Sequence, residues 1–174
     1  MSSLQVDSIS SMGGGHVDGA GLVVQFVSST TSLRQTFSST SNITCTVLRI
    51  PSFTPKFSNS KLIIELNGYF AKSPAASYAQ QGFGVMLMVG GVAIGNNTGS
   101  TESFLRVTPP ANAGSTLNYS RFVKKLVIDA GSTASKDIEF SVAVNTISSG
   151  GIVDLNLDGN GGAESILTVM ELAT

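Results

Sequence analysis

The residues with the clearest spacing for chemistry lie near the end of the chain. Asp154, Asn156 and Asp158, followed by a glycine, match the first half of an EF-hand calcium loop, D-x-N-x-D-G. The match ends there, because the twelfth loop position is Ser165 and the acid, Glu164, falls one residue early. The spacing gives a weak calcium candidate at Asp154, Asn156 and Asp158, and a strand entering a glycine-rich turn is the favoured interpretation.

Two further pairs of polar residues share strand faces. Glu65 lies two residues from Asn67, and Asp137 lies two residues from Glu139. Paired carboxylates about 5 to 10 Å apart carry out glycoside hydrolysis. Alternation along a half-buried strand produces the same pattern without any chemistry, and we favour that interpretation.

Nucleophilic and metal chemistry find little support. His16 is the only histidine and lies in a glycine-rich stretch, where no rigid base can be held against a nucleophile. Cys45, the only cysteine, is expected to be a small buried hydrophobic residue, and one Cys with one His cannot build a zinc site in one chain. The sequence therefore predicts no catalytic residue, no cofactor and no enzyme.

The composition excludes other classes of protein. Only 12 % of the residues are charged, against about 25 % in ordinary soluble domains, and the mean hydropathy is +0.25. The net charge is −1 and the basic residues are scattered, so no nucleic-acid partner is expected. The most apolar stretch, 83–95, is interrupted by Gly90-Gly91 and falls short of the roughly 20 residues that span a bilayer, so no membrane partner is expected. A surface with so few charged residues suits a protein whose faces are covered by copies of itself or by partners.

Alternation of apolar and polar residues predicts strands along most of the chain. In 61–70, Leu62, Ile64 and Leu66 share one parity, as on the buried face of a strand. Gly90-Gly91 predicts a two-residue type I′ hairpin. The other expected strands are 22–27, 43–50, 83–89, 92–95, 102–107, 117–129, 137–145, 152–157 and 165–172, with a Ser/Thr-rich connection over 28–42. Many short strands without a helix predict an all-β fold, an antiparallel β-sandwich of jelly-roll type.

The first residues differ from the rest. Residues 1–21 are poor in apolar side chains and rich in glycine, except for a small apolar set at Leu4, Val6 and Ile9. This predicts an extended N-terminal docking arm with a glycine-rich tether over 1–21 and a β-sandwich domain over 22–174.

Four segments together resemble a known family. They are "LQVDSISS" (4–11), "GLVVQFVSSTT" (21–31), "FTPKFSNSKLIIELNG" (53–68) and "ILTVMELAT" (166–174). In their order they resemble a β-sandwich domain of virion proteins of tailed phages, especially phages of cyanobacteria and marine bacteria. That family has an arm L-x-V-D-x-I, then G-x-V-x-Q-V, T-P-K-S-x-x-S-K-I and a closing strand L-T-V-M-E-I. The closing-strand residues of this chain are Leu167, Val169 and Leu172. The segment of about residues 70–150 departs from the family pattern.

The resemblance implies a non-enzymatic virion structural protein on the particle exterior, made in the host cytoplasm. It implies that the protein is a homotrimeric capsid decoration (cement) protein, which binds the major capsid protein and stabilises the head. The alternative is a tail-fibre, knob or head-fibre subunit, attached to tail or neck proteins, that binds host-surface glycans. Low charge, a docking arm and a compact β body agree with repeated assembly.

Two other classes remain as alternatives. A carbohydrate-binding module would use Tyr69, Tyr78 or Tyr119 as stacking platforms, although tyrosines in strands more often pack with a satisfied hydroxyl. An enzyme such as a depolymerase is disfavoured, because no set of residues supports it.

Overall fold

Strands dominate the protein in this computed structural model, which describes residues 21–38, 41–73, 81–94, 104–107, 118–146, 152–156 and 164–174. The strands of this part are β1 (Val23–Thr31), β2 (Gln35–Phe37), β3 (Ile43–Thr44), β4 (Ile50–Phe53), β5 (Lys61–Ser73), β6 (Gln81–Val89), β7 (Val92–Ile94), β8 (Phe104–Val107), β9 (Asn118–Asp129), β10 (Lys136–Thr146), β11 (Ile152–Leu155) and β12 (Ser165–Leu172). Within these residues, no helix is long and apolar enough to cross a membrane.

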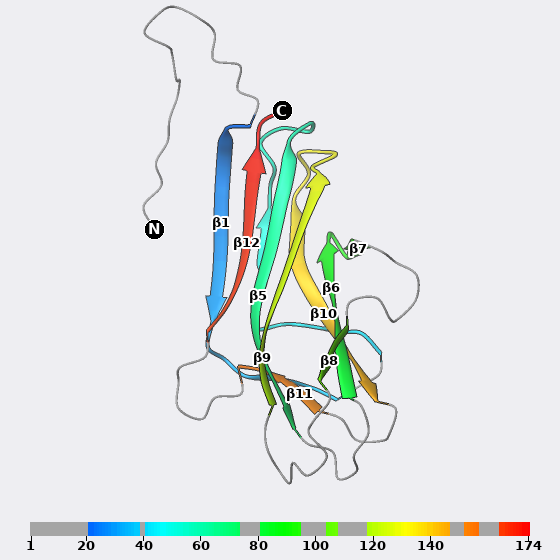
Figure 1. The fold of residues 1–174 in the computed structure, drawn as a ribbon. Helices are drawn as coiled ribbons and strands as arrows, with labels where there is room; N and C mark the ends of the chain where they lie inside the picture. The colour runs from blue at the N-terminus through cyan, green and yellow to red at the C-terminus, as the bar shows by residue number, and fades with distance from the viewer. Residues whose placement is uncertain are drawn as a thin grey trace, which may run out of the picture.

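The strands form two antiparallel sheets, here called sheet A and sheet B. In sheet A, β5 pairs with β9 along one edge, and along the other edge first with β12 and then with β11. Outside these, β1 pairs with β12 and β2 pairs with β11. Sheet A is therefore four positions wide, and Figure 1 shows β1, β12, β5 and β9 side by side along the length of the molecule.

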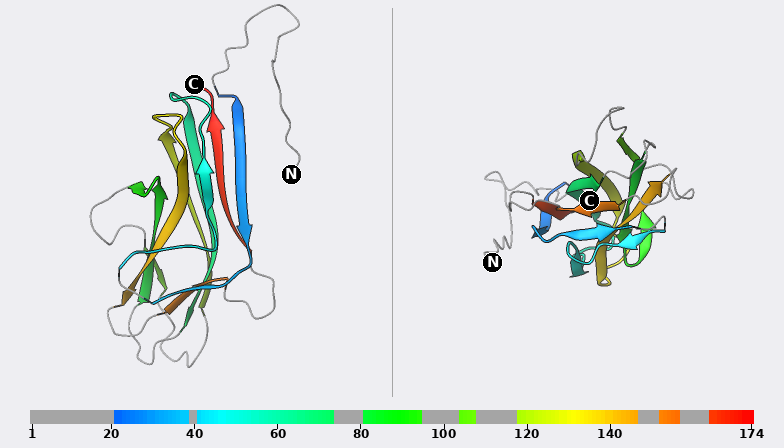
Figure 2. Two further views of the ribbon diagram at one scale, coloured as in Figure 1. Left: turned by 180° about the vertical axis from the view of Figure 1, so that it is seen from behind. Right: turned by 90° about the horizontal axis from the view of Figure 1, so that it is seen from below.

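Sheet B has the same width and the same kind of interruption. Its central strands, β10 and β6, pair along nine residues. The outer position beside β10 is shared by β3 and β4, and the outer position beside β6 is shared by β7 and β8. The two sheets lie against each other, as the view along the molecule shows (Figure 2).

The strand order is that of a jelly roll. Strands from the two halves of the chain pair in nested order: β1 with β12, β3 and β4 with β10, β5 with β9, and β6 with β7 and β8. These pairs alternate between sheet A and sheet B, so one long hairpin is rolled into two sheets, which is the jelly-roll arrangement. The prediction of an antiparallel β-sandwich of jelly-roll type is confirmed.

The core lies between the sheets and is centred on aromatic rings. Phe70 of sheet A packs against Phe83 of sheet B at 4.8 Å between ring centroids, and against Phe140 at 6.4 Å. Phe122 of β9 completes the group at 6.2 Å from Phe70. The apolar face predicted in 61–70 is confirmed, because Leu62, Ile64 and Leu66 are completely buried. Each such side chain contributes roughly 1.5 to 3 kcal/mol of burial free energy.

The predicted hairpin at Gly90-Gly91 is also confirmed. Val89 pairs with Val92, so the loop contains two residues, and Gly90 and Gly91 have φ angles of 58° and 77°. A type I′ turn requires positive φ at both positions, which glycine adopts without steric cost.

The prediction of one strand over 43–50 is wrong. The chain forms β3 at Ile43–Thr44, leaves the sheet, and forms β4 at Ile50–Phe53. Cys45 and Leu48 are both buried, a spacing of three that a strand cannot give. Pro51 lies inside β4, and among the described strands β4 pairs only with β10, so a residue without an N–H is tolerated there.

The intervening segment is held by a side chain of the other sheet. Oε1 of Gln35 in β2 accepts the backbone N–H groups of Thr46 (2.8 Å) and Val47 (3.3 Å). These bonds replace the ladder that a continuous strand would have made. The Ser/Thr-rich connection predicted over 28–42 is correspondingly wrong in part, because β1 continues to Thr31 and β2 lies within it.

Candidate functional site

A buried carboxylate joins three of the four segments that carry the family resemblance. Glu171 of β12 has the same inward parity as Leu167 and Val169, and it is completely buried. Its oxygens accept the backbone N–H of Lys56 (2.9 Å to each) and the N–H of Phe57 (3.0 Å). Several donors on one carboxylate offset the cost of removing it from water.

Two further groups complete this contact, which we call the Glu171 anchor. The hydroxyl of Ser60 donates to Oε1 at 2.6 Å. The side-chain amide of Gln25 in β1, oriented with its nitrogen toward β12, donates to Oε2 of Glu171 and to the carbonyl of Thr54, both at 3.2 Å. The motifs 21–31, 53–68 and 166–174 therefore meet at one carboxylate. The residues that match the family pattern at this point hold β1, β12 and the segment before β5 against one another.

Backbone bonds close the same end of the sandwich. Gly21 N–H donates to the carbonyl of Ala173 (2.6 Å), and Ala173 N–H donates to the carbonyl of Leu22 (2.9 Å). Thr174 Oγ1 donates to the carbonyl of Asn59 at 2.6 Å. Residues 173 and 174 are thus fixed beside the start of β1, where Figure 1 shows the C-terminus.

A second polar cluster lies where β1 gives way to β2 and β11 gives way to β12. Nδ2 of Asn156 donates to the carbonyls of Thr31 (2.9 Å) and Leu33 (3.1 Å). Its Oδ1 accepts the hydroxyl of Ser165 at 2.6 Å, and the Ser165 oxygen accepts the N–H of Tyr69 at 2.8 Å. These bonds satisfy the backbone at the two strand breaks.

The calcium candidate falls in this cluster. Oδ1 of the buried Asp154 accepts from Arg34 Nε (2.9 Å) and Thr36 Oγ1 (2.5 Å), so a guanidinium already pairs with this oxygen, whereas the buried Oδ2 has no hydrogen-bond partner among the described residues. Asn156 uses both side-chain atoms in protein bonds, and Asp158 lies outside the described residues. Within the part of the chain that is described, no group of three His, Cys, Asp or Glu side chains could hold a metal ion. Calcium binding stays a prediction.

The other polar candidates have structural partners. Glu65 lies 3.9 Å from Lys125 Nζ, and Glu139 lies 3.7 Å from Arg49. Oδ1 of Asp137 accepts the N–H of Ser52 at 2.8 Å. All three acids lie on outward strand positions, as the alternation indicated.

The remaining predicted residues divide into three groups. Leu167 and Val169 are buried in the core, and Leu172 is half-buried on the outward parity of β12. Tyr69 is half-buried, whereas the side chain of Tyr119 in β9 is not described. The arm residues Leu4, Val6 and Ile9, together with His16 and Tyr78, lie outside the described residues.

Cys45 is buried in the core, as predicted. Burial in apolar surroundings raises the pKa of its thiol. A buried, protonated thiol is a poor nucleophile, so this cysteine has a packing role.

The outer face of sheet A carries a feature that the strand patterns did not reveal. Phe26 of β1 pairs with Met170 of β12, Met170 with Ile63 of β5, and Ile63 with Val127 of β9. All four point outward, and Phe26 and Val127 are 56 % and 60 % exposed. They form a continuous apolar row across the sheet, here called the apolar row. Each of these residues lies on the solvent-facing side of its own strand, so only the cross-strand register brings them together.

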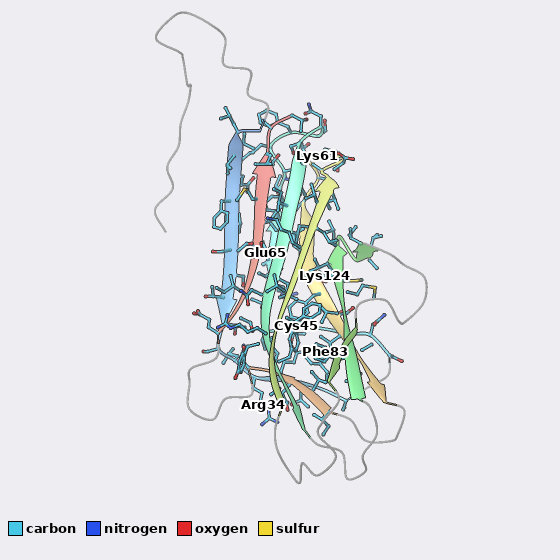
Figure 3. All side chains as sticks on the ribbon, viewed as in Figure 1. Arg34, Cys45, Lys61, Glu65, Phe83 and Lys124 are labelled. Carbon is cyan, nitrogen blue, oxygen red and sulfur yellow. The ribbon has the colours of Figure 1, made fainter. Side chains whose placement is uncertain are left out.

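Lys124 points inward from β9, the edge strand of sheet A. Its Nζ donates to the carbonyl of Val85 in β6 at 3.1 Å. On that edge of β6, the described residues of β8 pair up to Gly84, and those of β7 pair from Leu87 onward. Lys124 thus supplies a donor at the break between β7 and β8. Desolvation lowers the pKa of Lys124 below its usual range, and Figure 3 shows this residue on β9.

Comparisons with known proteins give no family. No protein-family model and no curated protein matches the chain. Dimeric latent PorU from Porphyromonas gingivalis aligns with 88 % of this chain and 14 % of its own at 13 % identity and a TM-score of 0.47. A D431N mutant VP2 protein of infectious bursal disease virus aligns with 87 % of this chain and 37 % of its own at 14 % identity and a TM-score of 0.36. The chain spans well under half of either protein, and TM-scores below 0.5 support no inference about function.

Replacing Glu171 by glutamine should lower the free energy of unfolding by about 3 kcal/mol. The amide keeps one oxygen as an acceptor but replaces the other by an N–H donor that would face the backbone N–H of Lys56, which approaches both oxygens in the wild type. Urea unfolding at 25 °C measures the change. Glu164→Gln, at an exposed position just before the same strand, is the control and should change stability by less than about 0.5 kcal/mol. Equal losses in the two variants would contradict the anchor role.

The lowered pKa of Lys124 predicts a pH-dependent stability. Between the folded-state pKa and the usual value near 10.5, the unfolded chain binds more protons than the folded one. Folding stability therefore rises with pH in this interval. Urea unfolding at several alkaline pH values should show the wild type gaining stability relative to Lys124→Met.

Lys125→Met is the matched control, because Lys125 is the next residue of β9 and points to solvent with 57 % exposure. The same pH trend relative to both variants would show that burial of Lys124 is not the cause.

Proposed function

We propose that the chain is a non-enzymatic structural protein of a tailed-phage virion, displayed on the particle exterior as a capsid decoration (cement) protein that stabilises the head. The resemblance of four ordered segments supports this role, and three of them converge on the Glu171 anchor. The residues that resemble the family therefore have structural roles in this fold, as expected if the resemblance reflects a common framework. The jelly roll itself is found in capsid, lectin and cupin proteins, so the fold alone does not select the function.

The observation that carries the proposal is the apolar row on sheet A. Monomeric proteins rarely expose a contiguous apolar stripe, and such patches usually mark interaction sites. Phe26 and Val127 at its two ends are more than half exposed. Meanwhile the described acids Glu65, Asp154 and Glu171 are engaged in ion pairs or hydrogen bonds within the fold. This arrangement favours assembly over catalysis.

In this role the protein forms a homotrimer bound to the major capsid protein. The arm residues Leu4, Val6 and Ile9 dock into neighbouring subunits, and the sandwich bodies pack around a threefold axis. Docking arms add affinity because the body keeps them at a high effective concentration.

A tail-fibre, knob or head-fibre subunit that binds host-surface glycans is the second candidate. One observation favours it: Tyr69 pairs with the exposed Arg121 across β5 and β9 on the outer face of sheet A. An aromatic ring beside a cation is suited to contact with sugars that carry acidic groups. In that case the partners are tail or neck proteins of the virion.

Immunogold electron microscopy of the encoding phage, with antibody raised against the sandwich body, tests the location. Gold spread evenly over the heads is the expected result for a decoration protein. Gold confined to the tail would replace it with the second candidate. If intact and gently disrupted particles both lack label, the virion role is wrong.

Deleting residues 1–12 should leave a folded body that no longer incorporates into particles. Circular dichroism checks the fold, and gel analysis of purified particles measures incorporation of the variant against wild type. Replacing Ser8 and Ser10 by alanine in the full-length chain is the control for altering the arm without removing its apolar residues. Normal incorporation of the truncated protein would rule out a docking arm.

A further inference from the structure

Charges flank the apolar row in an alternating pattern. On one side of the row, Lys61 of β5 pairs with Asp129 of β9, and on the other side Glu65 pairs with Lys125. Lys61 and Glu65 lie two residues to either side of Ile63, and Asp129 and Lys125 lie two residues to either side of Val127. The four charges therefore occupy the corners of a rectangle, with unlike charges along every side.

This pattern is complementary to itself under one particular rotation. In an isologous contact, a two-fold axis brings the same surface of two copies together. If the axis runs across the strands along the apolar row, each row residue meets its own counterpart and the flanking rows change places. Lys61 then faces Glu65 of the second copy, and Asp129 faces Lys125 of the second copy. All four charges meet an opposite charge.

Stacking that overlaps all four strands about an axis parallel to them lacks this match. With a two-fold axis parallel to the strands and between β12 and β5, Lys61 faces Leu172 of the second copy, and Glu65 faces Thr168. The charges on β9 then face β1, which carries Val23 and Ser28 at these levels. Charges removed from water without a partner are costly. A parallel axis between β5 and β9 would also match the charges, but it would leave β12 and β1, with half of the apolar row, outside the contact. Charge matching together with overlap of all four strands therefore selects the arrangement with the axis across the strands.

We propose that the outer face of sheet A is a self-association surface that binds a second copy of this chain, sheet A against sheet A, with the stacked strands running in opposite directions. The contact joins copies in pairs and is separate from a threefold contact. It follows from the face alone and does not depend on a virion role. Figure 3 shows two of the residues that define its register, Lys61 and Glu65, on β5.

The size of the face sets the expected strength. The aligned rows extend over four strands and over the seven residues Ile166–Leu172 of β12. With strands about 4.8 Å apart and about 3.3 Å per residue, the face measures roughly 19 by 23 Å. Stable interfaces bury about 800 Å² on each partner, and this face offers roughly half of that. We therefore expect weak, concentration-dependent pairing that becomes effective when many copies are held together.

Sedimentation equilibrium of the full-length protein over a wide concentration range tests the pairing. The wild type should associate beyond its basal oligomer by pairing, and Val127→Lys should raise the dissociation constant of this step at least about tenfold. Val92→Lys is the matched control, because Val92 in β7 of sheet B is 62 % exposed, as Val127 is 60 % exposed. Absence of paired species in the wild type, or equal weakening by both variants, overturns the proposal.

Charge reversal tests the orientation and does not rely on altering the apolar row. Lys61→Glu and Glu65→Lys should each weaken pairing several-fold, because like charges then face each other across the axis. The double variant should return to within about threefold of wild type, because its charges are again opposite. Each reversal also places like charges side by side within the chain, at positions 61 and 129 or 65 and 125, and this costs little because Lys61 and Glu65 are 46 % and 40 % exposed. A double variant weaker than both single variants overturns this arrangement.

A cross-link then tests the contact between the two sheet A faces directly. A cysteine introduced by Ile63→Cys should be joined to its counterpart by a bifunctional maleimide about 10 Å long, the usual spacing of stacked sheets. Cys45 does not compete, because it is completely buried. Failure to cross-link under conditions that favour pairing overturns the proposal. Pairing that appears only after deletion of residues 1–20 would also overturn it, since the chain's own arm would then be the natural occupant of the face.

Discussion

The carboxylate of Glu171 is the contact on which the arrangement of sheet A depends. Burying an unsatisfied carboxylate costs several kcal/mol, and here the cost is offset by donors from Lys56, Phe57, Ser60 and Gln25. These donors come from β1 and from the loop that leads into β5, the two neighbours of β12. A one-residue slip of any of these strands would move the acid or its donors out of reach. It would also exchange the inner and outer faces of that strand.

At the far end of sheet A, the polar groups that need partners are backbone groups at two strand breaks. There β12 and β1 give way to β11 and β2 while β5 continues past both breaks. Interrupted strands leave backbone groups without ladder partners, which is costly in a buried place. Asn156 and Ser165 satisfy these groups from the interior. The Glu171 anchor and the Asn156 cluster thus hold sheet A at two levels, with the aromatic core between the sheets.

Fixed register gives the outer face of sheet A its character. The apolar row exists because Phe26, Ile63, Val127 and Met170 are level with one another, and the charges beside it alternate for the same reason. Lys124 contributes to the same outcome from the inside, because an inward-pointing charge on an edge strand discourages edge-to-edge pairing. A rigid sandwich with a protected edge and a patterned flat face is suited to face-to-face assembly.

Local sequence determined most of the strand segments and the position of the tightest turn. Leu62, Ile64 and Leu66 in alternation, the strand 165–172 and the hairpin at Gly90-Gly91 all depend on neighbours within a few residues, and all three were predictable. The same parity rule placed Glu171 among Leu167 and Val169, which was the available signal for a buried acid. Its donors were not predictable, because they lie more than 100 residues away in the chain. The break between β3 and β4, the bonds of Asp154 and Asn156, and the apolar row were decided by tertiary structure. The physical reason is that each depends on which strands become neighbours and in what register, and cross-strand register is set by contacts between distant segments.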